Sequence, residues 1–345
     1  MPSGHQPPKD PITLTIEEVH ALATRCLMAS GADAENARAV ADTVTAAERD
    51  ICASHGLFRI PGYCASLKSG KANGNARPMA SQIAPSVVRV DGDGGFAPLA
   101  IEVGRAPLIE AARAQGVASL AINDIHHFAA LWPETQALAE AGLVGFAFTA
   151  ALPYVVSAGG RTPIFGTNPM SFAWPRPGKD PMVFDQASST LARGDIQIAR
   201  RDGHSVPLGT GVDTDGKDTT DPAAILDGGA QLPFGGYKGS AIAMMVELLT
   251  GALIGDKFSF EAQAVDNGDG GPPKGGEFML AIDPARHGDA EGWAAHAELL
   301  FERMLQDEGV RLPADRRHAN RKLTPTQGAQ IPASLHETLA GLAEG

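Results

Sequence analysis

Residues able to handle protons and anions lie close together in the stretch SHGLFR at residues 54–59. The ring of His55 titrates near neutrality, so it can give and take a proton. Ser54 could orient that ring or relay the proton, and Arg59 offers a planar fork suited to a carboxylate. A core histidine, a helix cap and a surface ion pair are the structural alternatives. Residue types and spacing alone leave open whether this stretch is a site, and a single histidine is more often structural.

Two glycine-rich stretches imitate phosphate-binding loops. VRVDGDGGFA at 88–97 resembles a dinucleotide fingerprint, but Asp91 and Asp93 would place negative charge where a pyrophosphate should lie. We expect a plain glycine turn there. LPFGGYKG at 232–239 fails the Walker spacing, yet its glycines, the helix that follows and Lys238 could bind an anion. A solvated lysine at a helix cap is the equally open alternative.

The composition narrows the class of protein. The 345 residues carry a formal net charge of −12, which argues against nucleic acid or an anionic membrane surface as a partner. Cys26, Cys52 and Cys64 match no zinc spacing, so no metal is expected. We see no secretory signal and no apolar run long enough to span a membrane. These features predict a cytoplasmic protein with reduced thiols.

Helices and strands must position these residues. Thr15 and Glu18 form a capping-box pattern that predicts a helix ending before Gly31, and a second helix should begin at Asp33. Alternating strands and helices after residue 85 suggest an α/β layer. The remaining predicted elements are strands at 86–90, 117–122, 143–149, 170–175, 181–185 and 277–283, and helices ending at 116 or lying over 128–142, 189–203, 239–254 and 290–309.

Several stretches together resemble the malate/L-lactate dehydrogenase family, whose members do not use a Rossmann fold. The resemblance runs across nearly the whole chain, and these motifs in this order are highly specific. They are SHGLFR at 54–59, GGRTPIFGTNPMSFAWP at 159–175, the stretch 183–226, LPFGGYKGSAIAMMVELL at 232–249 and GVRLPADRR at 309–317. Two details, HHFAALWPE at 126–134 and FDQASS at 184–189, are similar to the branch of Δ1-piperideine-2-carboxylate and Δ1-pyrroline-2-carboxylate reductases.

The resemblance implies a mixed α/β (α+β) fold with a central cofactor-binding sheet domain and a helix-rich second domain. We expect residues 1–120 to form a helix-rich, substrate-binding part that is joined by residues 286–345, and residues 121–285 to form the sheet domain. The family is usually homodimeric, with the active site between its domains. A homodimer that binds a small imino acid is therefore expected.

The resemblance also assigns roles to residues. Ser54, His55 and Asp195 become the catalytic group, with His55 as proton donor and Asp195 as the acid that holds its ring in the right tautomer. Arg59 and Thr167 become substrate contacts. Without the resemblance, Asp195 could equally be a solvated carboxylate on a helix face. The residues implied for cofactor binding are His127, Phe128, Ala129, Ala130, Leu131, Asp185, Gln186, Ala187, Tyr237, Lys238, Arg311, Arg316 and Arg317.

The last three arginines, in an otherwise acidic protein, suit a 2′-phosphate and favour NADPH over NADH. The leading hypothesis is an NADPH-dependent reductase that converts cyclic 2-imino acids to L-pipecolate or L-proline. A dehydrogenase of 2-hydroxy acids such as malate, L-lactate or ureidoglycolate is the alternative within the family. A serine-type or metal-assisted hydrolase is the alternative from another class, but G-x-S-x-G and H-E-x-x-H are both missing from the sequence.

Overall fold

The computed structural model describes residues 10–128 and 130–345, and the chain forms two compact units. The first unit contains the described residues up to Ala76, together with Asn267–Pro272 and Asp315–Gly345. The second contains Arg77–Asp266 and Pro273–Ala314. This division differs from the expected one. Residues 77–120 belong to the sheet-bearing unit, because the strands they contain pair within its sheet.

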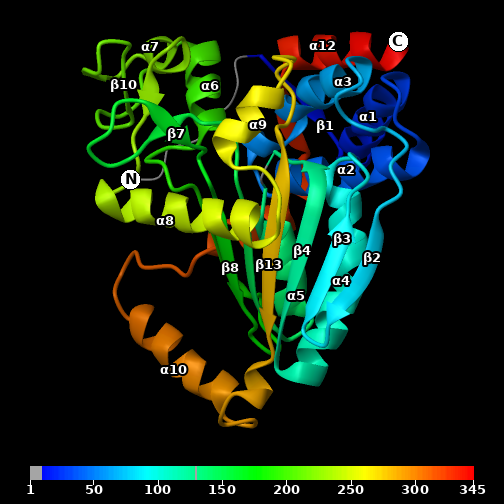
Figure 1. Ribbon diagram of the computed structural model, residues 1–345, viewed down its shortest axis with the longest axis vertical. Helices are drawn as coiled ribbons and strands as arrows, with labels where there is room; N and C mark the ends of the chain where they lie inside the picture. Colours follow the sequence, from blue (N-terminus) through cyan, green and yellow to red (C-terminus); the bar gives the residue numbers. More distant parts are fainter. Residues whose placement is uncertain (1–9, 129) are drawn as a thin grey trace. The chain divides into compact units, whose positions relative to one another are not determined.

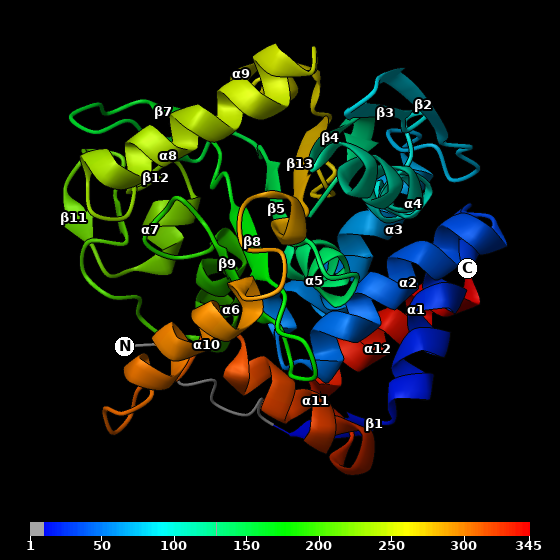
Figure 2. The same ribbon diagram turned by 90° about the horizontal axis from the view of Figure 1, so that it is seen from below.

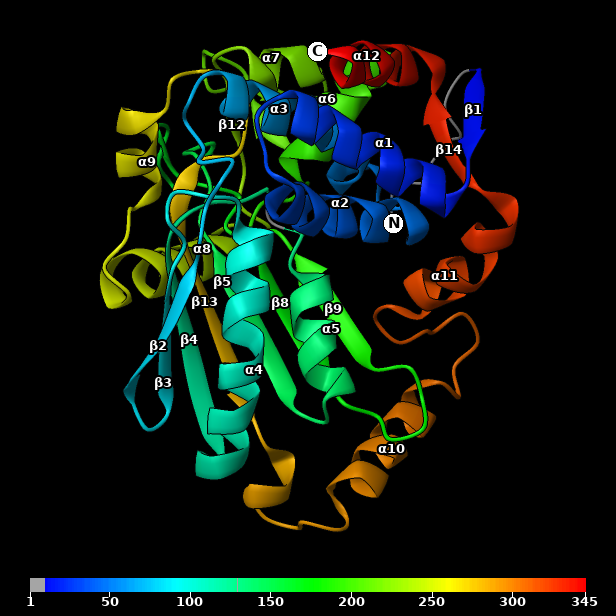
Figure 3. The same cartoon turned by 90° about the vertical axis from the view of Figure 1, so that its right-hand side faces the viewer.

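The first unit is helical and is assembled from both ends of the chain. The Thr15–Glu18 capping box and the Asp33 N-cap are both present, as the sequence predicts. Strands β1 and β14 pair antiparallel (Figure 3), and α12 packs against α1 (Figure 2). Its elements are β1 (Pro11–Leu14), α1 (Ile16–Ala29), α2 (Ala34–Arg49), the 3-10 turns Ala53–His55 and Leu57–Arg59, α3 (Ile60–Lys68), α11 (Asp315–Gln327), β14 (Ala329–Pro332) and α12 (Ala333–Glu344).

The second unit is built on a seven-stranded sheet in the order β2-β3-β4-β13-β5-β8-β9 (Figure 1). Only β3 and β4 run parallel among the described strands of this sheet, so its topology is not that of a doubly wound fold. The strands are β2 (Met79–Ala84), β3 (Val87–Asp91), β4 (Val117–His126), β13 (Lys274–Ile282), β5 (Val144–Thr149), β8 (Met170–Trp174) and β9 (Met182–Gln186).

Helices α4 (Ala97–Gln115) and α5 (Trp132–Glu140) cover one face of this sheet (Figure 3). Their apolar side chains and those of the strands form a buried core cluster that includes Leu108, Leu120 and Leu138. Burial of these side chains out of water drives this packing. Helix α4 ends at Gly116, as predicted, where the backbone has a positive φ of 85°.

A smaller sheet with the order β11-β10-β12-β6-β7 lies in the same unit. Its strands are β6 (Val155–Val156), β7 (Pro163–Phe165), β10 (Gly211–Val212), β11 (Asp218–Thr219) and β12 (Ala230–Gln231). The other elements of the unit are α6 (Arg193–Asp202), α7 (Pro222–Leu226), α8 (Tyr237–Glu247), the π-helical segment Leu248–Leu253, α9 (Ser259–Val265), the 3-10 turn Pro284–Arg286 and α10 (Trp293–Met304).

Two predicted helices differ in detail from those observed. The helix expected over 239–254 begins earlier, at Tyr237, and gives way to the π-helical segment after Glu247. The helix expected over 290–309 is α10, but it is followed by α11, β14 and α12, which the sequence did not predict. Within the described ranges, no helix combines the length and apolar character needed to cross a lipid bilayer.

Candidate active site

The stretch around His55 forms two short 3-10 turns between α2 and α3. The Ser54 hydroxyl lies 3.2 Å from Nδ1 of His55, so the two residues are hydrogen-bonded, as the sequence suggested. Arg59 donates its Nε–H to the Ser54 carbonyl at 2.7 Å. Ser54 is buried, whereas the rings of His55 and Phe58 and the Arg59 side chain are half-buried. The segment thus brings a titratable ring, a hydroxyl and a cation together.

A buried carboxylate fixes the backbone that leads into this segment. Asp50 accepts hydrogen bonds from Nε of Arg49 and Nε of Arg321, both at 3.0 Å, and Asn320 donates to its carbonyl. Burial opposes the charge, but the two guanidinium groups outweigh it and hold the pKa of Asp50 below its ordinary value. Sequence analysis did not single out Asp50 or Arg321, because 271 positions separate them.

In the second unit, Asp185 joins two of the predicted cofactor stretches. Its Oδ2 accepts hydrogen bonds from the backbone amides of Leu131 at 2.9 Å and Trp132 at 3.0 Å. These amides lie at the start of α5, where unpaired N–H groups favour a negative charge. The carboxylate at the end of β9 therefore anchors the residues that follow β4.

Ser188, three residues after Asp185, connects the loop at Thr167 and the turn before α8 to the Asp185 segment. Its amide donates to the Thr167 carbonyl at 2.7 Å, and its carbonyl accepts from the Phe234 amide at 3.0 Å. The Asp185–Ser188 segment thus touches three other predicted site regions, namely the residues after β4, the loop at Thr167 and the turn that leads into Tyr237. Sequence reasoning proposed these regions separately, and the structure brings them together within one unit.

The start of α8 presents a cation suited to a phosphate. Gly235 and Gly236 both have positive φ, 55° and 62°, and they lead directly into Tyr237 and Lys238, which are exposed. The amides of Gly236, Lys238 and Gly239 already donate to carbonyl groups within this turn. The cation of the exposed Lys238 side chain is the group here that suits a phosphate of a dinucleotide cofactor.

A buried polar network supports the loop that carries Thr167. Asn168 has a φ of 35° and donates through Nδ2 to Glu247 Oε1 at 2.8 Å and to the Ala243 carbonyl at 3.0 Å. Glu247 in turn accepts from the Ser259 amide at 2.9 Å and hydrogen-bonds to its hydroxyl. These residues were missed in the sequence analysis, although Asn in the motif FGTNP could have indicated a left-handed backbone position.

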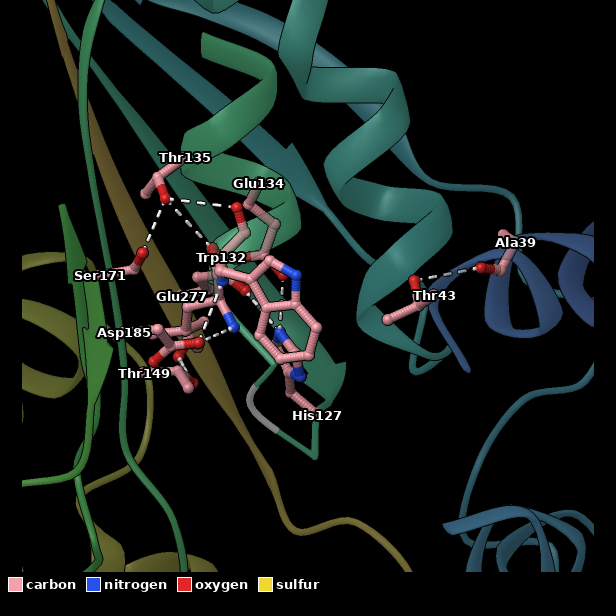
Figure 4. A network of polar contacts seen from close by, with 12 residues as sticks. Ala39, Thr43, His127, Trp132, Glu134, Thr135, Thr149, Ser171, Asp185 and Glu277 are labelled. Carbon is pink, nitrogen blue, oxygen red and sulfur yellow. Dashed lines mark hydrogen bonds and ion pairs between the residues drawn. The ribbon is translucent and has the colours of Figure 1, made fainter. Parts of the chain in front are cut away.

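His127 enters a buried cluster with two carboxylates (Figure 4). Its Nε2 lies 3.1 Å from Glu134 Oε1 on α5 and 3.1 Å from Glu277 Oε2 on β13. Burial lowers the pKa of His127, but Glu277 and Glu134 outweigh it and raise that pKa to about 10. Burial and the charge of Glu277 raise the pKa of Glu134. Both shifts favour the protonated forms, so His127 and Glu134 keep their protons to a higher pH than the same groups in water.

Among the described residues, these three are the group whose ligand atoms lie close enough for a metal ion. The protonated ring accounts for the geometry, because an imidazolium between two carboxylates gives the same spacing. The ring of His127, a predicted cofactor contact, lies inside this cluster. Ala129 lies outside the described residues.

The other predicted residues are divided between the units. Asp195 lies in the first turn of α6 and is half-buried. Gln186 is exposed, Ala187 is half-buried, and both follow Asp185. Arg311 belongs to the second unit, whereas Arg316 and Arg317 lie in the first turn of α11 in the first unit.

The stretch VRVDGDGGFA at 88–97, which imitates a dinucleotide fingerprint, forms the glycine turn that we expected. The Gly95 amide donates to the Gly92 carbonyl at 3.0 Å, and a Cβ added at Gly92 would lie 2.2 Å from Cγ2 of Ile125. Glycine is therefore needed there for packing against β4.

Comparison with known proteins gives full-length matches. A family model described as malate/L-lactate dehydrogenase matches residues 14–340. The chain is 50% identical over 335 residues to the Delta(1)-pyrroline-2-carboxylate/Delta(1)-piperideine-2-carboxylate reductase of Pseudomonas aeruginosa, covering 96% of this chain and 100% of that protein. It is 49% identical over 335 residues to the Delta(1)-pyrroline-2-carboxylate reductase of Ancylobacter novellus, covering 96% and 98% of the two chains.

The solved structures include a similar reductase. The structure of delta1-piperideine-2-carboxylate reductase from Pseudomonas syringae pathovar tomato matches with a TM-score of 0.91 at 43% sequence identity, covering 96% of this chain and 99% of that one.

Proposed function

The chain belongs to the malate/L-lactate dehydrogenase family, and on this premise we propose that it is an NADPH-dependent reductase of cyclic 2-imino acids. Its substrates are Δ1-piperideine-2-carboxylate, Δ1-pyrroline-2-carboxylate or both, and its products are L-pipecolate and L-proline. The observation that carries this proposal is the identity of about half of all residues, over 96% of the chain, to two proteins named as reductases of such imines.

Reduction of the C=N bond adds a hydride to carbon and a proton to nitrogen. Bound NADPH supplies the hydride to the imine carbon. We assign the proton to His55, whose ring can donate it near neutral pH. The Ser54 hydroxyl, 3.2 Å from Nδ1, is proposed to orient the ring. Asp195 is the acid proposed to stabilise the protonated ring.

Arg59 is proposed to bind the substrate carboxylate. Its Nε–H bonds to the Ser54 carbonyl, which holds the guanidinium beside the proton donor, and a guanidinium group suits a carboxylate. Thr167 is proposed as a second contact, on the loop that Asn168 and Glu247 support.

The cofactor-binding proposal is supported by the meeting of Asp185, Leu131 and the segment before Tyr237 within one unit. We assign the phosphates to Tyr237 and Lys238 with the glycine turn before them. The preference for NADPH over NADH depends on Arg311, Arg316 and Arg317, whose fixed charges suit a 2′-phosphate.

We also propose a homodimer. Helix α8 and the π-helical segment after it expose a row of large apolar side chains, and a second copy of this chain would cover them. The exposed fractions are 51% for Met244, 37% for Met245, 52% for Leu248 and 62% for Leu253.

The proposal is tested by incubating the purified protein with each cyclic imine and either NADPH or NADH, and following loss of the absorbance of the reduced nicotinamide. We expect turnover of at least one imine, with kcat/KM higher for NADPH. Oxidation of malate, L-lactate or ureidoglycolate with NAD, without imine reduction, would instead support the hydroxy-acid dehydrogenase that the family description allows.

A further inference from the structure

A buried carboxylate lies against the turn that follows His55. Glu48, in the last turn of α2, is only 6% exposed, and its Oε1 accepts a hydrogen bond from the Leu57 amide at 2.7 Å. A buried carboxylate needs such partners, because it has lost the solvation of water. The bond joins the end of α2 to the residue two positions after His55.

Gly56 is the position that makes this contact possible. A Cβ added there would lie 2.1 Å from Glu48 Oε1 and 2.5 Å from its Cδ, far closer than atoms can pack. The backbone of Gly56, with φ −87° and ψ −143°, is not in the left-handed region that favours glycine. A methyl group at this position would therefore have to push the carboxyl group of Glu48 away from the Leu57 amide, since that carboxyl group fills the volume that a side chain would need.

The chain between Glu48 and Ser54 is strained, which indicates that its path is held from both ends. Ile51 has a φ of 58°, a value that β-branched residues strongly disfavour. Asp50 is held on one side by Arg49 and Arg321. The Glu48–Leu57 hydrogen bond closes the loop on the other side, so the backbone of Ser54 and His55 lies between two buried anchors.

We propose that Glu48 is a positioning residue, which fixes the backbone that carries the proton donor His55. Gly56 leaves the space that the Glu48 carboxyl group fills. The inference rests on the proposed function for the role of His55. Glu48 itself need not touch substrate or cofactor, since it acts through the Leu57 amide. A displaced ring lowers the rate of proton transfer, because misplacement of a reacting group by about 1 Å can cost on the order of 100-fold.

The contact depends on an acceptor atom and not on a charge. Burial raises the pKa of Glu48 to about 7, with the Leu57 amide acting in the opposite direction, so both protonation states occur near neutral pH. Oε1 can accept the Leu57 N–H in either state. Glutamine keeps the same oxygen at the same reach, whereas alanine removes it. Glu48→Gln is therefore the conservative variant matched to Glu48→Ala.

The test compares Glu48→Ala, Glu48→Gln, Gly56→Ala and the double variant Glu48→Ala/Gly56→Ala. For each we would measure kcat and KM with NADPH and the cyclic imine, NADPH affinity by fluorescence titration, and hydrogen exchange of the peptide over residues 53–59. We expect Glu48→Ala and Gly56→Ala each to lower kcat roughly 10- to 100-fold and to speed exchange in this peptide, with the Kd for NADPH unchanged. Glu48→Gln should keep kcat within about threefold.

The double variant tests the steric link. With the Glu48 side chain gone, the methyl group that Gly56→Ala introduces has room, so the double variant should have the kcat of Glu48→Ala alone. Multiplied losses in the double variant would contradict the inference, as would a wild-type kcat in Glu48→Ala. If Glu48→Ala does not fold, Gly56→Ala and Glu48→Gln carry the test, and wild-type kcat in Gly56→Ala overturns it.

The two proposals fail in different ways. A wild-type protein that reduces no cyclic imine contradicts the proposed function, while hydrogen exchange still shows whether Glu48 holds the Leu57 amide. Normal imine reduction together with unchanged kcat and unchanged exchange in Glu48→Ala contradicts the inference about Glu48 alone.

Discussion

Asp185 shows how one side chain in this protein hydrogen-bonds to backbone groups that lie far away in the sequence. Asp185 at the end of β9 accepts from the amides of Leu131 and Trp132, more than fifty positions earlier. The family resemblance assigned Asp185 to cofactor binding. The structure shows that its carboxylate caps α5, which precedes it in the sequence. The side chain therefore shapes the start of α5 and the backbone of the residues before it.

Because Asp185 caps α5 beside the proposed cofactor site, we expect its removal to lower both the stability of the protein and its affinity for NADPH. Asp185→Ala should lower the free energy of unfolding by about 1–2 kcal/mol, as expected for a lost helix cap, and should weaken NADPH binding several-fold. Asp33→Ala is the matched control, because Asp33 caps α2 in the other unit by accepting from the Asn36 amide. That variant should lose similar stability and keep its Kd for NADPH. Equal Kd values for both variants and the wild type would contradict the role given to Asp185.

Local motifs were predictable at this scale, and distant partners were not. The two residues of the Thr15–Glu18 box are three positions apart, so its hydrogen bonds follow from the sequence alone. Glu277 was not singled out, because nothing near it in the sequence indicates that β13 will pair with β4 and bring it to His127. A histidine between two buried acids becomes visible only once the strand order is known.

At the scale of elements, the His127 cluster joins the end of β4, helix α5 and strand β13 through one protonated ring. The ring is charged in the folded protein at pH values where it is neutral in the unfolded chain, because its pKa is raised from 6.5 to about 10. The proton that folding takes up stabilises the native state fully below pH 6.5. That contribution is lost as the pH rises toward 10.

Unfolding free energy should therefore fall between pH 7 and 9.5 in the wild type, on the order of 3 kcal/mol from this group. Glu277→Gln keeps the size of the side chain and removes one charge, so it should make the decline smaller. The control Glu302→Gln changes an exposed glutamate, so its unfolding free energy should fall with pH at the same slope as that of the wild type. Urea unfolding at several pH values measures this, and identical slopes in all three proteins would contradict the assignment of the proton to His127.

Long, periodic elements could be predicted, and short or polar ones could not. The helix ending at Gly116 and the strands of the large sheet have clear apolar patterns. Strands β6, β10, β11 and β12 are two residues each, too short to carry a period. Helix α11 was missed because DRRHANRKLTPTQ is strongly polar and contains Pro325, so its arginines suggested an anion site in place of a helix.

At the scale of the whole molecule, each unit is assembled from segments that are separated in the chain. Asn267–Pro272 belongs to the first unit although the residues on either side of it belong to the second. Lys71 and Asp269 form a buried ion pair there at 2.5 Å. A division by simple ranges could not have foreseen this, because the glycine-rich stretch NGDGGP at 267–272 has the composition of an ordinary surface loop. The family resemblance supplied the fold class, which strand–helix alternation alone would not have given.

The apolar side chains exposed on α8 and on the π-helical segment after it lead us to predict the oligomeric state. The wild type should sediment as a dimer, and Leu248→Glu should shift it toward the monomer, since a charge cannot be buried against a second copy without a partner. Ile83→Glu is the matched control, because Ile83 on β2 is 60% exposed and lies outside the proposed interface. Analytical ultracentrifugation measures both. A monomeric wild type, or equal dissociation of the two variants, would contradict the interface.

The central claim is that His55 supplies the proton for imine reduction while the cofactor is held by other residues. The most direct measurement is kcat of His55→Ala with Δ1-piperideine-2-carboxylate and Δ1-pyrroline-2-carboxylate, together with its Kd for NADPH by fluorescence titration. The account predicts a loss of kcat of roughly 100- to 10,000-fold with the Kd within about twofold of the wild type. Wild-type turnover by His55→Ala would contradict it.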